Sequence, residues 1–269
     1  MHDCEKVRAY YDAQAAREWT RAERHPVEFG ITRRLLLRHL PPPPARVLDV
    51  GGGPGHYSLW LSGLGYRVTL VDLSPGNIAL AREKSAELGV ALDGCLVGNA
   101  LELDRHAGPG WDAVLLMGPL YHLTRPEDRQ AALSQAVAAL APGGILATAF
   151  ISDYAPIIDS LKYDPGEIRG KGAELMELFR HGINRGGDGD GFTAAWFCGT
   201  AGIEALMNRP DLERLALCTQ ESILGPYEEA LKKAEPGLME ECLELAMAFV
   251  EDEGCRACGE HYLHLARKR

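Results

Sequence analysis

The stretch VLDVGGGPG, residues 47–55, decides how the rest of the chain is interpreted. It begins in the apolar run RVLDV (46–50) and ends with four glycines in five positions. Glycine weakens regular structure, so such a cluster needs a backbone reason, either a tight turn or the close approach of main chain to a ligand. We therefore predict a buried strand that runs through this turn into a helix.

Strands and helices alternate after this turn. Apolar runs predict further strands at 66–72, 94–98, 111–118 and 145–150. A helix is expected at 74–88, with Ser74 as N-cap and a proline at its first position. A second is expected within 124–144, opened by Thr124 and Glu127 in capping-box spacing and ended by Pro-Gly-Gly. The alternation predicts an α/β fold with helices on both faces of a parallel sheet.

The flanking segments have different patterns. Residues 1 to about 40 predict helices, and four prolines follow at 41–44. Beyond the fifth strand we expect a helix near 173–181, a turn at GGDGDG (186–191) without the spacing of a calcium loop, and a sixth strand at 212–220. Two helices within 228–253, broken by Pro-Gly, and a final strand at 261–269 complete the chain.

Composition limits the partners. The 269 residues carry a net charge of -10, which argues against a nucleic-acid partner and a polybasic membrane anchor. No run approaches the roughly 20 apolar residues of a membrane span. An odd set of seven scattered cysteines without a signal peptide predicts reduced thiols and a cytoplasmic location.

The strand ends suggest a ligand. Open parallel sheets bind ligands beyond the carboxyl ends of their strands, and an acidic residue after the second strand commonly bonds ribose hydroxyls. Asp72 occupies that position, so Asp72 and the glycine turn together predict an adenosine-type cofactor. The pattern Gly51-x-Gly53-x-Gly55 departs from the G-x-G-x-x-G of dinucleotide sites, which weakens an NAD interpretation.

The ordered segments VLDVGGGPG, VTLVDLS, GNA, DAVLLMGPLYHL and LAPGGILATAF resemble the class I S-adenosylmethionine-dependent methyltransferases over residues 45–150. GPLYHL further resembles a bacterial subgroup that acts on small molecules. The resemblance implies a Rossmann-like seven-stranded sheet, mostly parallel with an antiparallel last strand. It also implies methyl transfer from S-adenosylmethionine to an oxygen or nitrogen of a small-molecule acceptor.

The resemblance further implies a division of the chain. Residues 1–44 would form a helical lid, 45–150 the cofactor-binding core, 151–200 an inserted substrate lobe, and 201–269 the C-terminal part of the domain. Packing of the N-terminal aromatic residues in a core is the alternative to a lid. The residues expected to contact the cofactor are Asp49, Gly51, Gly53, Asp72, Leu73, Asn99, Ala100, Met117 and Tyr11.

Acceptor contacts are expected after the fourth strand. Tyr121 and His122 are the candidate catalytic and substrate-binding residues, because histidine titrates near neutral pH and could take a proton from the acceptor. Trp196 and Phe150 are predicted to line an apolar acceptor pocket. Trp196 and His122 could instead serve packing alone.

No metal is expected. Cys255, Cys258, His261 and His264 are three apart, but zinc sites usually separate their ligand pairs further, and the two histidines would face opposite sides of one strand. Two other functions stay open, an NAD-dependent oxidoreductase and a non-catalytic nucleoside-binding protein. The oligomeric state is also open.

Overall fold

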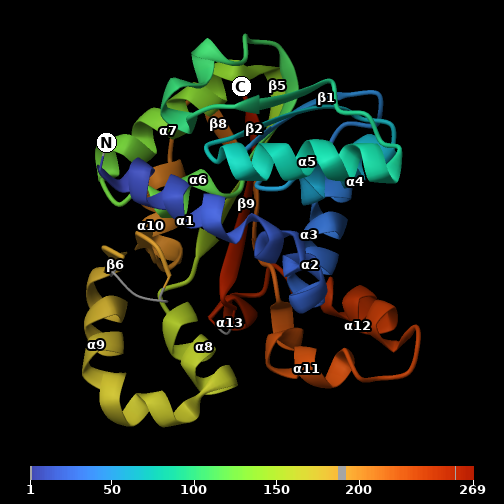
Figure 1. The fold of residues 1–269 in the computed structure, drawn as a ribbon. Helices are drawn as coiled ribbons and strands as arrows, with labels where there is room; N and C mark the ends of the chain where they lie inside the picture. The colour runs from blue at the N-terminus through green and yellow to red at the C-terminus, as the bar shows by residue number, and fades with distance from the viewer. Residues whose placement is uncertain (1, 187–191, 258) are drawn as a thin grey trace.

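The computed structural model describes residues 2–186, 192–257 and 259–269 and centres on a seven-stranded sheet (Figure 1). Its strand order is β3-β2-β1-β4-β5-β9-β8. The strands are β1 (Arg46–Val50), β2 (Arg67–Asp72), β3 (Gly94–Val97), β4 (Trp111–Leu116), β5 (Leu140–Ile151), β8 (Leu212–Thr219) and β9 (His261–Lys268). A separate two-stranded sheet pairs β6 (Ile183–Asn184) with β7 (Ala195–Trp196).

The direction of the strands confirms the predicted architecture. β1, β2, β3, β4 and β5 pair in parallel, and β9 runs antiparallel to both of its neighbours, β5 and β8. The last strand of the chain therefore lies inside the sheet. In the dinucleotide-binding order 3-2-1-4-5-6, by contrast, the last strand lies at the edge of the sheet.

Helices cover both faces of the sheet, as expected. The helices are α1 (His2–Trp19), α2 (Arg21–Arg24), α3 (Pro26–His39), α4 (His56–Gly63), α5 (Pro75–Leu88), α6 (Pro119–His122), α7 (Pro126–Ala139), α8 (Ala155–Tyr163), α9 (Ile168–His181), α10 (Thr200–Met207), α11 (Glu228–Leu231), α12 (Leu238–Ala246) and α13 (Glu253–Arg256). Side chains of α7 and α10 pack on one face, and those of α3, α4 and α12 on the other. Alternate residues of the central strands supply the two cores.

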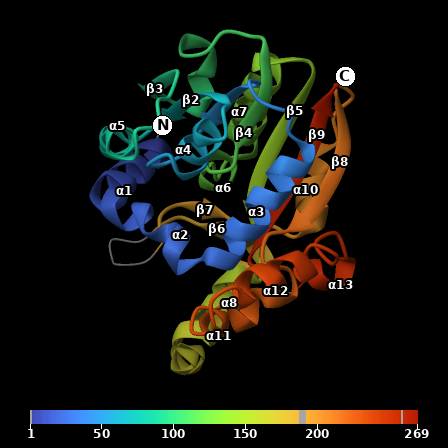
Figure 2. The ribbon, with the colours of Figure 1, turned by 90° about the vertical axis from the view of Figure 1, so that its right-hand side faces the viewer.

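The segments outside the sheet extend from one edge of it. Figure 1 shows α8 and α9 below the sheet, on the side where β9 begins and the parallel strands end. Figure 2, turned by 90°, places α11 and α12 at the same end and α3 along one face. No helix in the described ranges combines the length and apolarity needed to cross a membrane.

The N-terminal cap predicted from the sequence is correct for α5 and wrong for α7. The Ser74 hydroxyl oxygen caps α5 by accepting a hydrogen bond from the Asn77 N–H at 3.0 Å, as predicted. The capping box of α7 is wrong: the helix begins at Pro126 with Arg125 at the N-cap position, and Glu127 pairs with the Arg125 side chain. That helix also ends at Ala139, and β5 already begins at Leu140, before the Pro-Gly-Gly that was expected to end the helix.

The turns that follow β1 and β4 are pressed together at the carboxyl edge of the sheet. Gly51 has a φ of +70°, and a Cβ there would lie 2.6 Å from the ring of Pro119. A Cβ on Gly118 would lie 2.7 Å from the Gly51 carbonyl oxygen. Glycine at both positions is therefore a steric requirement, and it brings the first turn against the start of α6.

Gly51→Ala tests this constraint. We expect a loss of about 2–4 kcal/mol in the free energy of unfolding, because alanine adds left-handed backbone strain to a clash with Pro119. Gly170→Ala in exposed α9 is the control, and we expect it to be neutral or to stabilise by up to about 1 kcal/mol. Urea unfolding followed by circular dichroism measures both, and an equal effect of the two substitutions would contradict the packing argument.

Candidate functional site

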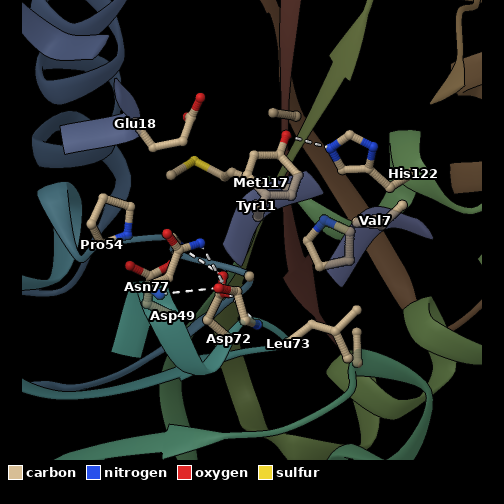
Figure 3. A pocket seen from close by; sticks show the side chains of 18 of the residues that line it. Val7, Tyr11, Glu18, Asp49, Pro54, Asp72, Leu73, Asn77, Met117 and His122 are labelled. Atoms are coloured by element: carbon tan, nitrogen blue, oxygen red, sulfur yellow. Dashed lines mark hydrogen bonds between the residues drawn. The ribbon is translucent and has the colours of Figure 1, made fainter. Parts of the chain in front are cut away.

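A cavity that is partly open to solvent lies at the carboxyl ends of β1, β2 and β4 (Figure 3). Helix α1 closes it from above through Val7, Tyr11 and Glu18. All of the predicted site residues line the cavity except Phe150 and Trp196.

Asp72 organises the wall at the end of β2. One carboxylate oxygen accepts from the Gly53 N–H at 2.8 Å, and the other accepts from the Ser74 N–H at 2.9 Å and from the Asn77 amide at 3.2 Å. Burial raises the pKa of this carboxyl, and these hydrogen bonds work in the opposite direction. Asp72 thus fixes the glycine turn and the start of α5 while it faces the cavity. Asn77, which the sequence analysis missed, follows Asp72 by five residues.

Asp49 lies beneath the glycine turn at the end of β1. Its carboxylate accepts from the Ser58 hydroxyl at 2.7 Å. A Cβ on Gly52 would lie 2.4 Å from this carboxylate, so the turn needs glycine to pass over it. Burial raises the pKa of the Asp49 carboxyl to about 7, although the bond from Ser58 lowers it.

Asn99 and Ala100 line the cavity after β3. The side-chain oxygen of Asn99 accepts from the Leu101 N–H at 3.0 Å and so starts the 3-10 helix Ala100–Arg105. Its amide nitrogen faces Cys4 of α1. The side-chain oxygen of Asn99 is therefore engaged in a local turn.

Tyr11 and His122 meet across the cavity, as the dashed line in Figure 3 shows. The Tyr11 hydroxyl lies 2.7 Å from Nε2 of His122, and Nδ1 of His122 lies 2.9 Å from the Ala194 carbonyl oxygen. Tyr121 contacts the same imidazole, with ring centroids 4.7 Å apart. Burial lowers the pKa of His122 to about 4, so the ring is neutral at ordinary pH.

Another part of the cavity wall is polar. None of its residues was predicted from the sequence to contact the acceptor. Arg21 donates one hydrogen bond to Glu28 at 2.9 Å and makes a second ion-pair contact with it at 2.8 Å, and both residues line the cavity. Gln220 donates to Thr32 at 2.7 Å, and its own Oε1 is buried with no hydrogen-bond partner in the described chain. Gln220 comes from the end of β8, far along the chain, so no local motif marks it.

Glu28 also belongs to a close group with Glu221 and His261, whose ligand atoms lie within 4.8 Å of one another. Burial alone would lower the pKa of His261, but the two carboxylates raise it to about 9. His261 bonds Glu221 at 2.6 Å, and Arg21 holds Glu28. An ion-pair network accounts for this geometry, and the expectation of no metal stays a prediction.

The other metal candidate is only partly described, since Cys258 lies outside the described residues. His261 bonds Glu221, whereas His264 is 2% exposed and packs within the sheet. The two histidines stand three apart on β9 and so face opposite sides of the strand. The turn expected at GGDGDG also falls largely on residues outside the described ranges.

Phe150 and Trp196 lie away from the cavity. Phe150 is fully buried in the core, with its ring 6.2 Å from that of Trp196. The Arg129 guanidinium covers the Trp196 ring at 3.8 Å, and Arg129 also donates to the Leu123 carbonyl. Both rings pack in the core on one face of the sheet, so the structure gives no support to their predicted role in binding an acceptor.

Comparison with known proteins agrees with this geometry. Residues 47–144 match a family model described as a methyltransferase domain. A ubiquinone biosynthesis O-methyltransferase of Methylobacterium nodulans is 33% identical over 136 residues, which cover 48% of this chain and 53% of that relative. One from Xanthomonas axonopodis pv. citri is 38% identical over 107 residues, with 40% and 43% covered. The chain spans about half the length of the curated relatives that it matches.

Solved structures extend the likeness to the whole fold. Magnesium protoporphyrin IX methyltransferase from Synechocystis PCC 6803, solved with bound SAH, superposes with a TM-score of 0.59. The alignment covers 99% of this chain and 100% of that chain at 14% identity, which shows a shared fold alone. The match over residues 47–144 shows that this part of the chain is similar to a methyltransferase domain, and the sheet order and the cavity at its carboxyl edge agree with that similarity.

Proposed function

We propose that the chain binds S-adenosylmethionine in this cavity and transfers the methyl group to a small-molecule acceptor. The observation that carries the proposal is the meeting of Asp72 with the glycine turn in one cavity, where the Gly53 N–H reaches the carboxylate. A Cβ on Gly53 would meet only Asn77, at 3.9 Å, so the space beside the turn is open. This is the cradle that the adenosine and methionine portions of such a cofactor need.

The residues present fit this cofactor. Asp72 would hold the ribose hydroxyls, Leu73 and Ala100 would flank the adenine, and Met117 would supply an apolar wall. When bound, the cofactor supplies a methyl group already activated by a positively charged sulfur. The chain therefore has to orient the acceptor and keep out water. Helix α1, which covers the cavity, would serve both purposes.

The acceptor would occupy the part of the cavity bounded by Tyr121, His122 and Gln220. The curated relatives are named O-methyltransferases, which favours an oxygen acceptor. The antiparallel β9 argues against the NAD-dependent alternative. The GPLYHL subgroup, the lid and lobe divisions, the cytoplasmic location and the absence of a nucleic-acid partner stay predictions.

Binding tests the cofactor site. We expect Asp72→Asn to weaken S-adenosylhomocysteine binding about 10- to 100-fold, since a hydrogen bond to a charged group contributes about 1.5–3 kcal/mol. Asp93→Asn removes an exposed carboxylate that pairs with Arg67 and should bind as the wild type does. Isothermal titration calorimetry measures both, and equal affinities would exclude Asp72 from the site.

Asp49 should couple binding to pH. A cationic methionine portion beside it would favour the carboxylate, so cofactor binding should release a proton and tighten as pH rises from about 6 to 8. Calorimetry at pH 7 in two buffers of different ionisation enthalpy measures the released proton. The Asp49→Asn variant should lose this proton release. An unchanged proton release in the variant would show that Asp49 does not lie beside the cationic part of the cofactor.

Transfer is tested directly with a metabolite extract and cofactor that carries a labelled methyl group. Label should appear in low-molecular-mass products. Tight cofactor binding with no transfer would favour the non-catalytic nucleoside-binding alternative.

A further inference from the structure

Hydrogen bonding fixes the tautomer of His122. Its Nδ1 faces the Ala194 carbonyl oxygen at 2.9 Å, and a carbonyl oxygen can only accept. Nδ1 therefore carries a proton. The ring is 7% exposed and packs against the Tyr11, Tyr121 and Phe192 rings, so no carboxylate compensates a second proton there. In the neutral ring Nε2 therefore carries no proton and can only accept a hydrogen bond.

The orientation of the Tyr11 hydroxyl follows from this tautomer. Because Nε2 has no proton, the hydroxyl must donate its own across the 2.7 Å contact. Within residues 2–186, 192–257 and 259–269, the Tyr11 oxygen has no second hydrogen-bond partner. Tyr11 lines the cavity, so its oxygen presents only lone pairs to a ligand. A ligand atom that faces it has to donate a hydrogen bond.

The Tyr11–His122 pair lies between two parts of the cavity. Tyr11 comes from α1, which covers the half of the cavity formed by Asp72 and Asn99, and His122 comes from α6, directly after the Met117 wall. Their contact therefore bridges the cofactor half and the acceptor half. The methyl group has to cross at this boundary.

We propose that Tyr11 accepts the proton of a hydroxyl acceptor and relays its own proton to His122. This inference rests on the proposed function. The acceptor oxygen forms a bond to the methyl carbon, and the sulfur keeps the electron pair of the bond that breaks. The hydroxyl proton passes to Tyr11 Oη while the Tyr11 proton passes to Nε2. One positive charge is lost at sulfur and one appears on the imidazole, so charge balances.

The relay selects oxygen over nitrogen. A hydroxyl oxygen that gains a methyl group while it keeps its proton is a far stronger acid than imidazolium, so even a weakly basic histidine takes that proton. A methylated amine holds its proton with a pKa near that of lysine, about 10, far above the pKa of about 4 of His122. Alcohols and phenols are therefore the acceptor class that fits.

The first experiment needs neither cofactor nor acceptor. Long-range ¹⁵N–¹H correlation spectra of the full chain, labelled with [¹⁵N]histidine, report the state of each imidazole. The signals of His122 are those absent from His122→Gln. We expect a neutral ring protonated at Nδ1, with an Nε2 signal that changes in Tyr11→Phe and not in Tyr10→Phe. Protonation at Nε2, or a charged ring at pH 7, would overturn the proposal.

The second experiment follows transfer of a [¹³C]methyl group into the extract, where the methyl chemical shift distinguishes O-methyl from N-methyl products. Tyr11→Phe should lower kcat about 100-fold or more while S-adenosylhomocysteine binds within about threefold of the wild type. The double variant Tyr11→Phe/His122→Gln should be no worse than Tyr11→Phe, because the two act as one unit. Tyr10→Phe is the matched control, since Tyr10 lies outside the cavity wall.

The outcomes separate the two proposals. Full activity of Tyr11→Phe, or an N-methyl product, overturns the relay and leaves the proposed function intact. Absence of both cofactor binding and transfer in the wild type overturns the proposed function and the relay with it. An O-methyl product with the expected loss in Tyr11→Phe supports both.

Discussion

The close contact between the turns that follow β1 and β4 is the constraint on which the site depends. Gly51 and Gly118 approach until neither has room for a Cβ. Strand pairing alone sets the distance between β1 and β4, but this contact sets the path of the chain after each strand. It puts the open side of the glycine turn opposite Asp72 and starts α6 at Pro119. The two parts of the cavity that we propose for the cofactor and the acceptor are therefore positioned by one steric requirement.

Much of the fold could be predicted from short segments. Apolar runs bounded by glycine or proline predicted each strand of the main sheet, and the Ser74 cap was correct because its partner is only three residues away. The predicted start of α7 was wrong for a tertiary reason. Buried Arg129 binds the carbonyl oxygens of Leu123 and Thr124 while its guanidinium covers Trp196. The two carbonyl contacts are local, but the contact with Trp196 joins segments far apart in the chain, and no local pattern contains it.

The site divides in the same way. Asp72 and the glycine turn are close in sequence, so their pattern could be detected. Tyr11 and His122 were each predicted, but for different ligands, because 111 residues separate them and their hydrogen bond is visible only in the structure. Gln220 and Thr32 are 188 residues apart, and neither belongs to a motif. Contacts between residues this far apart in the chain could not be predicted from the sequence.

Helix α1 is held over the cavity by a few polar contacts. Asp12 accepts from the Ser74 hydroxyl and the Gly76 N–H, Tyr11 bonds His122, and the Trp19 ring stacks on His56. Among residues 4–19 of the helix only Val7 is buried, so undocking of the helix needs less free energy than opening of the sheet. We therefore expect α1 to open before the sheet does, and the residence time of a molecule bound in the cavity would then report how firmly this one helix is held.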